Sequence, residues 1–265
     1  MPVEPAPAAS VILVRPGHAS PLEVYLIRRA AGMRFLGGYY AFPGGKVDLA
    51  DGRPETLQRT RGLDPAAALA RLGPGDSPVP ASTYWVTAVR ELFEETGLLL
   101  VVDGAGRPID PEAPGTAERL EAHRLALVRG ERSLTAILAG EGWLADLSAL
   151  SYLAHFVTPP SSPIRFSARF FLCPLPPTQA PRLILGEISE GLWVAPATAY
   201  GRFRAGEWPM AEPAEYGMRY LAQFESWDAL WEHHRAGGAR FDGIIDRLDA
   251  ARQYHFTWPP APVGD

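Results

Sequence analysis

Several sequence features are rare in this chain, and their rarity excludes some classes of protein and of binding site. Cys173 is the only cysteine among 265 residues, which excludes an internal disulfide framework and a cysteine-based zinc site. Its neighbours Phe170, Phe171 and Leu172 favour a buried structural thiol over a reactive one. No apolar run approaches the roughly 20 residues that a membrane-spanning helix needs, and no basic region followed by an apolar stretch marks the N-terminus. We therefore expect a cytoplasmic protein with no membrane partner.

Lysine is also scarce, so almost all of the positive charge is arginine. Lys46 is the only lysine, and the formal net charge is −5. Sequence-independent nucleic-acid binding needs a basic surface that neutralises phosphates, so we expect no nucleic-acid partner. With 47% hydrophobic residues, the chain can bury a sizeable core. We expect one elaborated domain over residues 1–265.

The segment Arg90-Glu-Leu-Phe-Glu-Glu-Thr-Gly-Leu98 is the most informative part of the sequence. Apolar and small residues recur around it at spacings of three and four, which predicts a helix that ends at Gly97: Trp85, Val89, Leu92 and Thr96. Three carboxylates, Glu91, Glu94 and Glu95, fall on another face near the C-terminal end, where each opposes the helix dipole by about 0.3–1 kcal/mol. They form either a solvated acidic face or oxygen ligands for a divalent cation such as Mg²⁺.

A glycine-rich segment upstream favours the cation site. Phe42-Pro-Gly-Gly-Lys-Val-Asp48 follows an apolar strand, and paired glycines let the backbone approach an ion or a phosphate closely. Together the two segments resemble the Nudix box, Gly-x5-Glu-x7-Arg-Glu-apolar-x-Glu-Glu-x-Gly-apolar. The second half matches from Arg90 through Leu98. The first half matches at Gly45, but Asp51 replaces the family's first Glu, and residues 52–89 fill a gap that the family usually spans with seven residues.

The interruption of the box is itself informative. Residues 53–82 are rich in Pro, Gly and Ala. This composition predicts that the insert, at about 52–82, is a surface excursion from the fold, that is, a loop-rich segment with one short helix at 65–72. An insertion at this point resembles the Nudix branch that includes the peroxisomal acyl-CoA diphosphatase and its bacterial relatives. The segments 34–45, 156–160 and 165–171 support that resemblance, which extends from about residue 10 to about residue 222.

The order of the predicted elements agrees with the fold that the resemblance implies. Strands are predicted at 10–14, 23–28, 39–42, 98–102, 152–157, 164–172 and 191–194, and further helices at 112–129, 134–147, 196–206, 213–224 and 226–235. The resemblance implies the α/β class: an α/β/α Nudix sandwich with a mixed sheet and extra C-terminal helices. Helical elaborations at about 103–149 and 196–258 should then cap the cavity beside the box.

The resemblance also implies a chemistry for individual residues. Glu91, Glu94 and Glu95 would hold Mg²⁺ or Mn²⁺, with the Gly44 carbonyl as a further ligand. Arg90 would orient the glutamates through charge-assisted hydrogen bonds. Asp51, at the position of the family's first Glu, would be either supporting or dispensable. Water would then attack a diphosphate linkage while the metal neutralises charge on the phosphates.

Two parts of this chemistry stay open. The general base is either a box glutamate, Glu91 or Glu94, or an acid from a loop, for which Glu187 and Glu190 are candidates; both of these also fit ordinary exposed acids. Further substrate contacts would come from Gly45, Lys46, Arg165 and Arg169. The two arginines share a strand face at i,i+4 and fit either substrate phosphates or a structural salt bridge.

Three histidines are not expected to bind metal. His155 lies in a strand, where packing or a hydrogen bond is the simpler role. His233 and His234 are neighbours in a predicted helix, so their side chains point apart.

For the substrate, the resemblance, through the placement of the insert and the Phe42-Pro-Gly-Gly-x-x-Asp48 pattern, favours CoA or acyl-CoA, cleaved to 3′,5′-ADP and (acyl-)phosphopantetheine. The alternatives are a diphosphatase for ADP-ribose, dinucleotides or nucleotide sugars, and a non-catalytic ligand-sensing Nudix module. All three predict a small nucleoside diphosphate derivative as the partner. The oligomeric state stays open, with a homodimer as one option because homodimers are frequent among similar proteins.

Overall fold

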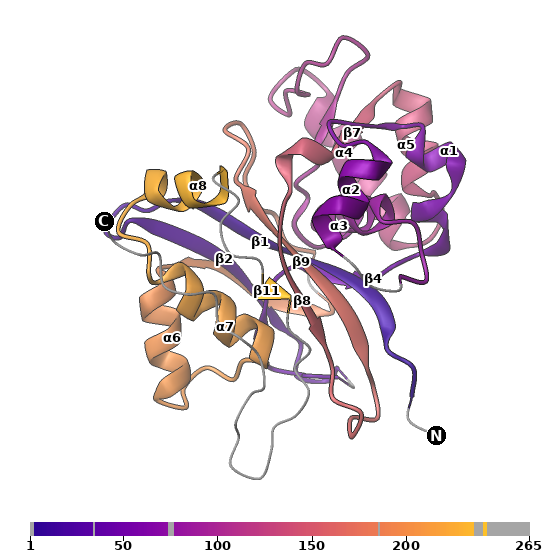
Figure 1. Cartoon of the computed structure of the whole chain (residues 1–265). Helices are drawn as coiled ribbons and strands as arrows, with labels where there is room; N and C mark the ends of the chain where they lie inside the picture. The colour runs from indigo at the N-terminus through magenta and orange to yellow at the C-terminus, as the bar shows by residue number, and fades with distance from the viewer. Residues whose placement is uncertain (1–2, 34, 74–76, 185, 236–240, 243–265) are drawn as a thin grey trace.

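A mixed β-sheet runs through the protein, and helices cover both of its faces (Figure 1). The computed structural model describes residues 3–33, 35–73, 77–184, 186–235 and 241–242. The long strands are β1 (Ala6–Pro16), β2 (Leu22–Arg29), β8 (Ser151–Val157), β9 (Phe166–Pro174) and β10 (Ile188–Val194). The short ones are β3 (Tyr40–Ala41), β4 (Gly44–Lys46) and β11 (Phe241–Asp242).

The strand order is β10-β2-β1-β9-β8-β11, with β3 beside β2 and β4 beside β1. The pairs β1/β9 and β8/β11 are parallel, and the other pairs of this sheet are antiparallel. β1 therefore lies at the centre, where it pairs with β2 near its C-terminal end and with β4 near its N-terminal end. This arrangement places the glycines of β4 directly beside the central strand.

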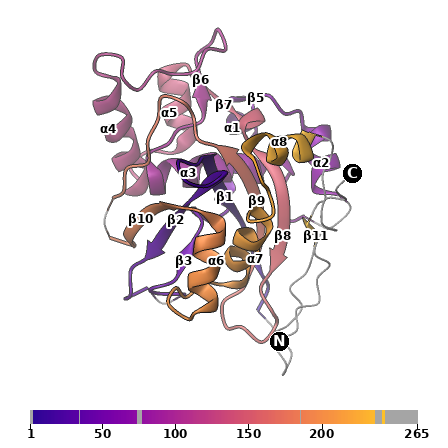
Figure 2. The same cartoon turned by 90° about the vertical axis from the view of Figure 1, so that its left-hand side faces the viewer.

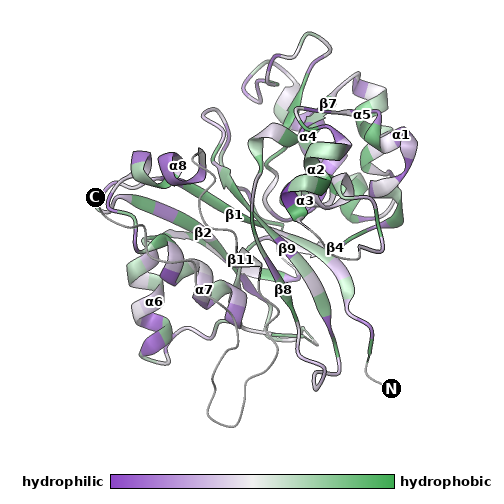
Figure 3. Ribbon diagram, viewed as in Figure 1, coloured by the Kyte–Doolittle hydropathy of each residue, from purple (hydrophilic) through white to green (hydrophobic). Residues whose placement is uncertain are grey.

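Both faces of the sheet are buried. Ala9, Val11 and Leu13 of β1 belong to one apolar core, whereas Ile12 and Val14 belong to the other. A strand buried on both faces reads in the sequence as a nearly continuous apolar run, as β1 does. Figure 3 shows the same pattern, with apolar residues concentrated in the central strands and hydrophilic ones along the outer helices.

Different helices cover the two faces. Helix α3 (Ser82–Thr96) packs on one face, and α6 (Pro196–Arg204), α7 (Glu212–Leu221) and α8 (Trp227–Arg235) pack on the other (Figures 1 and 2). The predicted α/β/α sandwich is confirmed. The prediction that segment 196–258 caps the box is wrong for these three helices, because the sheet lies between them and α3. Residues 236–240 and 243–258 lie outside the described part.

The insert is more than a surface excursion. Helix α2 occupies Pro65–Leu72 as predicted, but the 3-10 helix η1 (Leu49–Gly52), helix α1 (Pro54–Leu57) and strand β5 (Thr60–Arg61) precede it. Thr56 is buried, and its hydroxyl lies 2.6 Å from the Ala50 carbonyl and 2.5 Å from the Thr135 hydroxyl. The insert is therefore docked against the rest of the protein.

The segment between the box and β8 departs from the prediction in two places. Helix α4 (Thr116–Val128) and helix α5 (Leu134–Glu141) form, but α5 ends at Gly142, whose left-handed backbone (φ 70°) stops the predicted 134–147 helix early. Residues Leu144–Asp146 instead form β7, which joins β5 and β6 (Val101–Val102) in a small second sheet, followed by the 3-10 helix η2 (Leu147–Ala149). Only the last two residues of the predicted 98–102 strand are in a strand.

Within the described ranges, no helix combines the length and the apolar character needed to cross a bilayer.

Candidate functional site

The box helix α3 is held rigidly beneath the glycine strand. Its residues are buried from Ser82 to Phe93, and the indole N–H of Trp85 donates to the Leu150 carbonyl over 3.2 Å. Gly97 ends the helix with a left-handed backbone (φ 74°), and its N–H donates to the Phe93 carbonyl. Because a glycine adopts this conformation without strain, the position of the last turn, which carries Glu94 and Glu95, is well defined.

The two halves of the motif meet in space. A Cβ built on Gly45 would lie only 2.6 Å from the carboxylate atoms of Glu91, so glycine is needed for the two to approach. The Gly44 N–H donates to a carboxylate oxygen of Glu95 over 2.7 Å. At Gly44 a Cβ would collide with the Ala9 carbonyl and the Ser10 side chain. The paired glycines therefore let the backbone of β4 lie directly against the carboxylates.

Arg90 ties the site together through its whole guanidinium group. Its Nε and one terminal nitrogen donate to Asp51 at 3.0–3.1 Å, and that nitrogen also donates to the Lys46 carbonyl at 2.7 Å. The other terminal nitrogen lies 2.7 Å from Glu91 and 3.4 Å from Glu94. Burial opposes the charge, but Glu91 and Asp51 outweigh it, so the pKa of Arg90 is raised.

Asp51 is a buried anchor in this network. It is 2% exposed, and besides Arg90 it accepts a hydrogen bond from the Thr87 hydroxyl at 2.8 Å. Asp48 and Asp51 also form a capping box at the start of η1. The roles of Thr87 and Asp48 were not predicted from the sequence. The capping box could have been predicted, because the two aspartates lie three residues apart at the start of a short helix.

The three glutamates are in an environment that disfavours their charged forms. Burial raises the pKa of Glu91 to about 7, although Arg90 opposes the shift. Burial raises the pKa of Glu95 to about 8, and the neighbouring Glu91 adds to this. The pKa of Glu94 is raised as well, chiefly by burial. Arg90, with Arg29 acting on Glu95, does not fully compensate the three crowded carboxylates and Asp51.

This donor set fits a divalent cation chemically. Carboxylate oxygens are the ligands that Mg²⁺ and Mn²⁺ prefer, and the backbone beside Gly45 is open enough for Glu91 to lie against it. In the described residues, no three Asp, Glu, His or Cys side chains already converge on one point. Glu91 and Glu94 point toward Arg90, and Glu95 points toward the Gly44 amide. Coordination would therefore require side-chain rotation at an otherwise fixed backbone.

Of the two loop candidates for the general base, Glu190 lies away from this cluster. Glu190, on β10, accepts a hydrogen bond from the Tyr40 hydroxyl at 3.3 Å and lies 3.8 Å from Arg28. Tyr40 belongs to the core on the face opposite α3, so the structure does not bring Glu190 together with the box glutamates. The Glu187 side chain is exposed, and its backbone carbonyl accepts from the Ala30 N–H.

The side chains that were expected to contact substrate phosphates lie in different places. Lys46 is exposed and contributes its backbone carbonyl to Arg90. Arg165 lies just before β9, not on it, and donates to the carbonyls of Thr158 and Val3. Arg169 is buried on the α3 face, where it contacts His155 and Ser167 and lies over the Tyr84 ring at 4.7 Å. The two arginines do not form one site.

The remaining sequence candidates have structural roles. His155 is hydrogen-bonded to Ser167 at 2.8 Å, and burial lowers its pKa to about 3. His234 contacts the Tyr220 hydroxyl at 3.0 Å. Cys173 is fully buried, as predicted.

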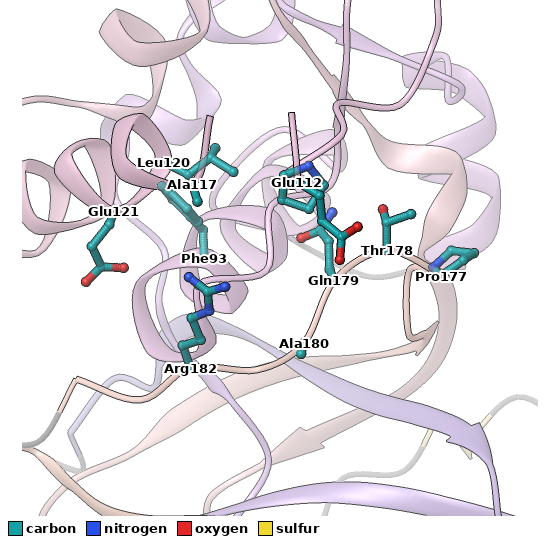
Figure 4. Close-up of a pocket in the computed structure, with 12 residues that line it drawn as sticks. Phe93, Glu112, Ala117, Leu120, Glu121, Pro177, Thr178, Gln179, Ala180 and Arg182 are labelled. Carbon is teal, nitrogen blue, oxygen red and sulfur yellow. The ribbon is translucent and has the colours of Figure 1, made fainter. Parts of the chain in front are cut away.

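A cavity of about 310 Å³ lies at the C-terminal end of α3 (Figure 4). It lies between α3, the start of α4 and the loop 177–182, and its lining mixes apolar residues such as Leu120 with charged ones such as Glu121 and Arg182. Gln179 fastens this loop by donating to and accepting from the Leu99 backbone at 3.1 and 2.9 Å. The cavity therefore has a defined wall next to the last turn of the box helix.

Comparison with known proteins gives consistent matches. Residues 6–221 match the family model of the NUDT19 Nudix domain. The chain is 30% identical to the acyl-coenzyme A diphosphatase NUDT19 of Gallus gallus, over 84% of this chain and 69% of that protein. It is 28% identical to the acyl-coenzyme A diphosphatase NUDT19 of Homo sapiens, over 87% of this chain and 68% of that protein.

A solved structure agrees with these matches. A NUDIX hydrolase from Alicyclobacillus acidocaldarius is 34% identical, with a TM-score of 0.72, over 86% of this chain and 96% of the other. The similarity therefore covers the sheet, the box and the insert together.

Proposed function

Because this chain is a Nudix hydrolase of the NUDT19 Nudix domain family, we propose that it hydrolyses the diphosphate linkage of CoA or acyl-CoA to 3′,5′-ADP and (acyl-)phosphopantetheine. The observation that supports this most directly is the contact between the two motif halves, with Glu91 against Gly45 and Glu95 on the Gly44 amide. The named function of the two NUDT19 relatives supports the choice of substrate.

The residues have distinct roles in this proposal. Glu91, Glu94 and Glu95, with the Gly44 carbonyl, would hold Mg²⁺ or Mn²⁺. When bound, the metal would neutralise the substrate phosphates and make water more acidic. The missing side chains at Gly44 and Gly45 let the β4 backbone lie against Ser10 and the Glu91 carboxylate, so this backbone is held beside the carboxylates that would bind the metal.

Arg90 and Asp51 have a positioning role. The buried Asp51 fixes the guanidinium group of Arg90, which in turn orients Glu91 and Glu94. A metal-bound site depends on such supporting contacts because they restrict the ligands to one arrangement.

The general base is assigned to Glu94. It is half-buried, its pKa is raised, and its contact with Arg90 is the longest in the network at 3.4 Å, so it is the box carboxylate least committed to structure. Glu190 contacts Tyr40 on the opposite face of the sheet, which argues against it. Glu187 is exposed and is tested as the alternative.

The proposal is tested by product analysis. Purified protein with Mg²⁺ or Mn²⁺ is incubated with CoA, acyl-CoA, ADP-ribose and a diadenosine compound, and the products are separated. We expect 3′,5′-ADP from CoA or acyl-CoA at the highest kcat/KM. A preference for ADP-ribose, dinucleotides or nucleotide sugars would replace the proposed substrate, and no turnover of any compound would favour a ligand-sensing module.

The assignment of the base has its own test. Glu94→Gln should lower kcat by about 100-fold or more at unchanged folding, because a base typically contributes 10²–10⁴-fold. Glu187→Gln should retain turnover, and Glu55→Gln, at an exposed position of α1, serves as the control. Loss of turnover in Glu187→Gln with activity retained in Glu94→Gln would transfer the role to the loop.

A further inference from the structure

A buried arginine from outside the Nudix motif lies against the last turn of the box helix. Arg124 is on α4 and is 1% exposed. Its Nε donates to the backbone carbonyl of Glu94 over 3.0 Å. One terminal nitrogen lies 3.2 Å from the position that a Cβ on Gly97 would occupy. Arg124 therefore contacts the turn that carries Glu94 and Glu95 from the side of α4.

Arg124 has few other partners for its charge or for its N–H groups. The nearest carboxylate is that of Glu121, at 3.9 Å, and this side chain is 44% exposed. The other terminal nitrogen has no hydrogen-bond partner among the described residues. Burying a guanidinium group with so few partners is unfavourable unless its position serves another purpose.

The C-terminal end of the box helix has no positive group of its own, and Arg124 supplies one. The last four carbonyls of a helix have no partner within the helix, and a positive group near them is favourable. No basic residue occupies the last turn of α3. Gly97 binds the Phe93 carbonyl, the Arg182 N–H binds the Thr96 carbonyl at 2.7 Å, and Arg124 binds that of Glu94. Of these three hydrogen bonds, the one from Arg124 is the only one whose donor is a charged side chain.

We propose that Arg124 is a positioning residue for the metal-binding carboxylates: it holds the last turn of α3 so that Glu94 stays beside Arg90 and Glu95 stays on the Gly44 amide. Its hydrogen bond fixes the backbone of Glu94, and its side chain packs against Gly97. The effect on the site is indirect, because Arg124 contacts the backbone and not the carboxylate oxygens. This inference rests on the proposed function, since it assumes that Glu94 and Glu95 bind a divalent cation.

The test measures metal binding separately from turnover. Mn²⁺ affinity of purified Arg124→Met and Arg124→Lys is measured by calorimetry, together with Tm and with kcat and KM for the best substrate. Loss of a group that orients metal ligands typically weakens metal affinity or activity by 10–100-fold. We expect about this loss of Mn²⁺ affinity in Arg124→Met. A smaller loss is expected in Arg124→Lys, which keeps the charge but cannot reproduce both contacts. The change in turnover should be in kcat more than in KM.

A matched control is available on the same helix. Arg129 is exposed at the end of α4, and Arg129→Met should leave Mn²⁺ affinity and kcat unchanged. If Arg124→Met does not fold, Arg124→Lys decides the question. Unchanged or tighter Mn²⁺ binding in a folded Arg124 variant would overturn the inference. If the wild-type protein itself neither binds Mn²⁺ nor cleaves a diphosphate, the proposed function fails instead.

Discussion

Replacing Asp51 tests whether the acid at the start of the insert is the anchor of the site. Asp51→Asn keeps the size of the side chain but removes the charge that faces Arg90 at 3.0 Å. Removing one partner of a buried ion pair typically costs about 3–5 kcal/mol because the remaining charge is left uncompensated. Here Glu91, at 2.7 Å, still compensates part of the charge of Arg90, so we expect a loss of about 2–4 kcal/mol in the free energy of unfolding.

The loss is measured by urea unfolding, followed by tryptophan fluorescence, at pH 7.5. Glu55→Gln is the control, because it makes the same carboxylate-to-amide change at an exposed position of the same segment and should change stability by no more than about 0.5 kcal/mol. A double-mutant cycle with Arg90→Gln isolates the pair, and we expect a coupling of about 1–3 kcal/mol between the two residues.

Asp51→Asn should also lower kcat/KM by about 10–100-fold, because a less restrained Arg90 no longer fixes the orientation of Glu91 and Glu94. A loss of stability below about 0.5 kcal/mol, the range of surface substitutions, would refute the structural anchor. A large loss of stability with unchanged kcat/KM below the unfolding temperature would show that Asp51 serves the fold alone.

Three further predictions follow from the site and the core. Gly45→Ala places a methyl group against the Glu91 carboxylate, so it should lower kcat/KM at least tenfold and destabilise by about 1–3 kcal/mol, whereas Gly104→Ala, at a position with open space, should do neither. In metal-free protein, the raised pKa values of Glu91 and Glu95 mean that these carboxyls bind more protons in the native state than in the unfolded chain, so Tm should fall between pH 7 and 8. The buried His155 and His234 have lowered pKa values and act in the opposite direction, but above about pH 7 histidines have lost most of their protons in the unfolded chain as well. Addition of Mn²⁺ should reduce the fall, and a Tm that rises over this range would contradict the prediction. Burial raises the pKa of Cys173 to about 12, so a thiol reagent at pH 8 should label it only as fast as the protein unfolds, and rapid labelling of the folded protein would disprove its burial.

Elements with a strong local signal could be predicted from the sequence. The box helix has a clear apolar period and a glycine stop, and α2 begins with proline after an N-cap aspartate, so both were placed correctly. The segment 134–147 could not be placed, because its helical period continues past Gly142 and only pairing with β5 and β6 makes Leu144–Asp146 a strand. Strand pairing is a long-range contact that a local pattern does not contain.

The candidate site likewise contains residues that the sequence predicted and residues that it did not. The residues that would hold a metal were predicted because their chemistry is written in a short motif. Their supporting contacts were not predicted: Thr87 binds Asp51 across the insert, and Arg124 reaches Glu94 from another helix. Glu190 could not be placed either, because the register of β10 with β2 brings it to Tyr40, on the face of the sheet opposite α3.

The sequence by itself determined the family and the sandwich, and it supplied the prediction that Glu91, Glu94 and Glu95 are the site carboxylates, since these depend on residue type and on spacing along one helix or strand. Only the tertiary structure decided that Asp51 is a buried partner of Arg90, that α6, α7 and α8 lie behind the sheet, and that the end of the box helix rests on Arg124. These features depend on burial and on contacts between segments far apart in the chain, which become defined only when the whole chain packs.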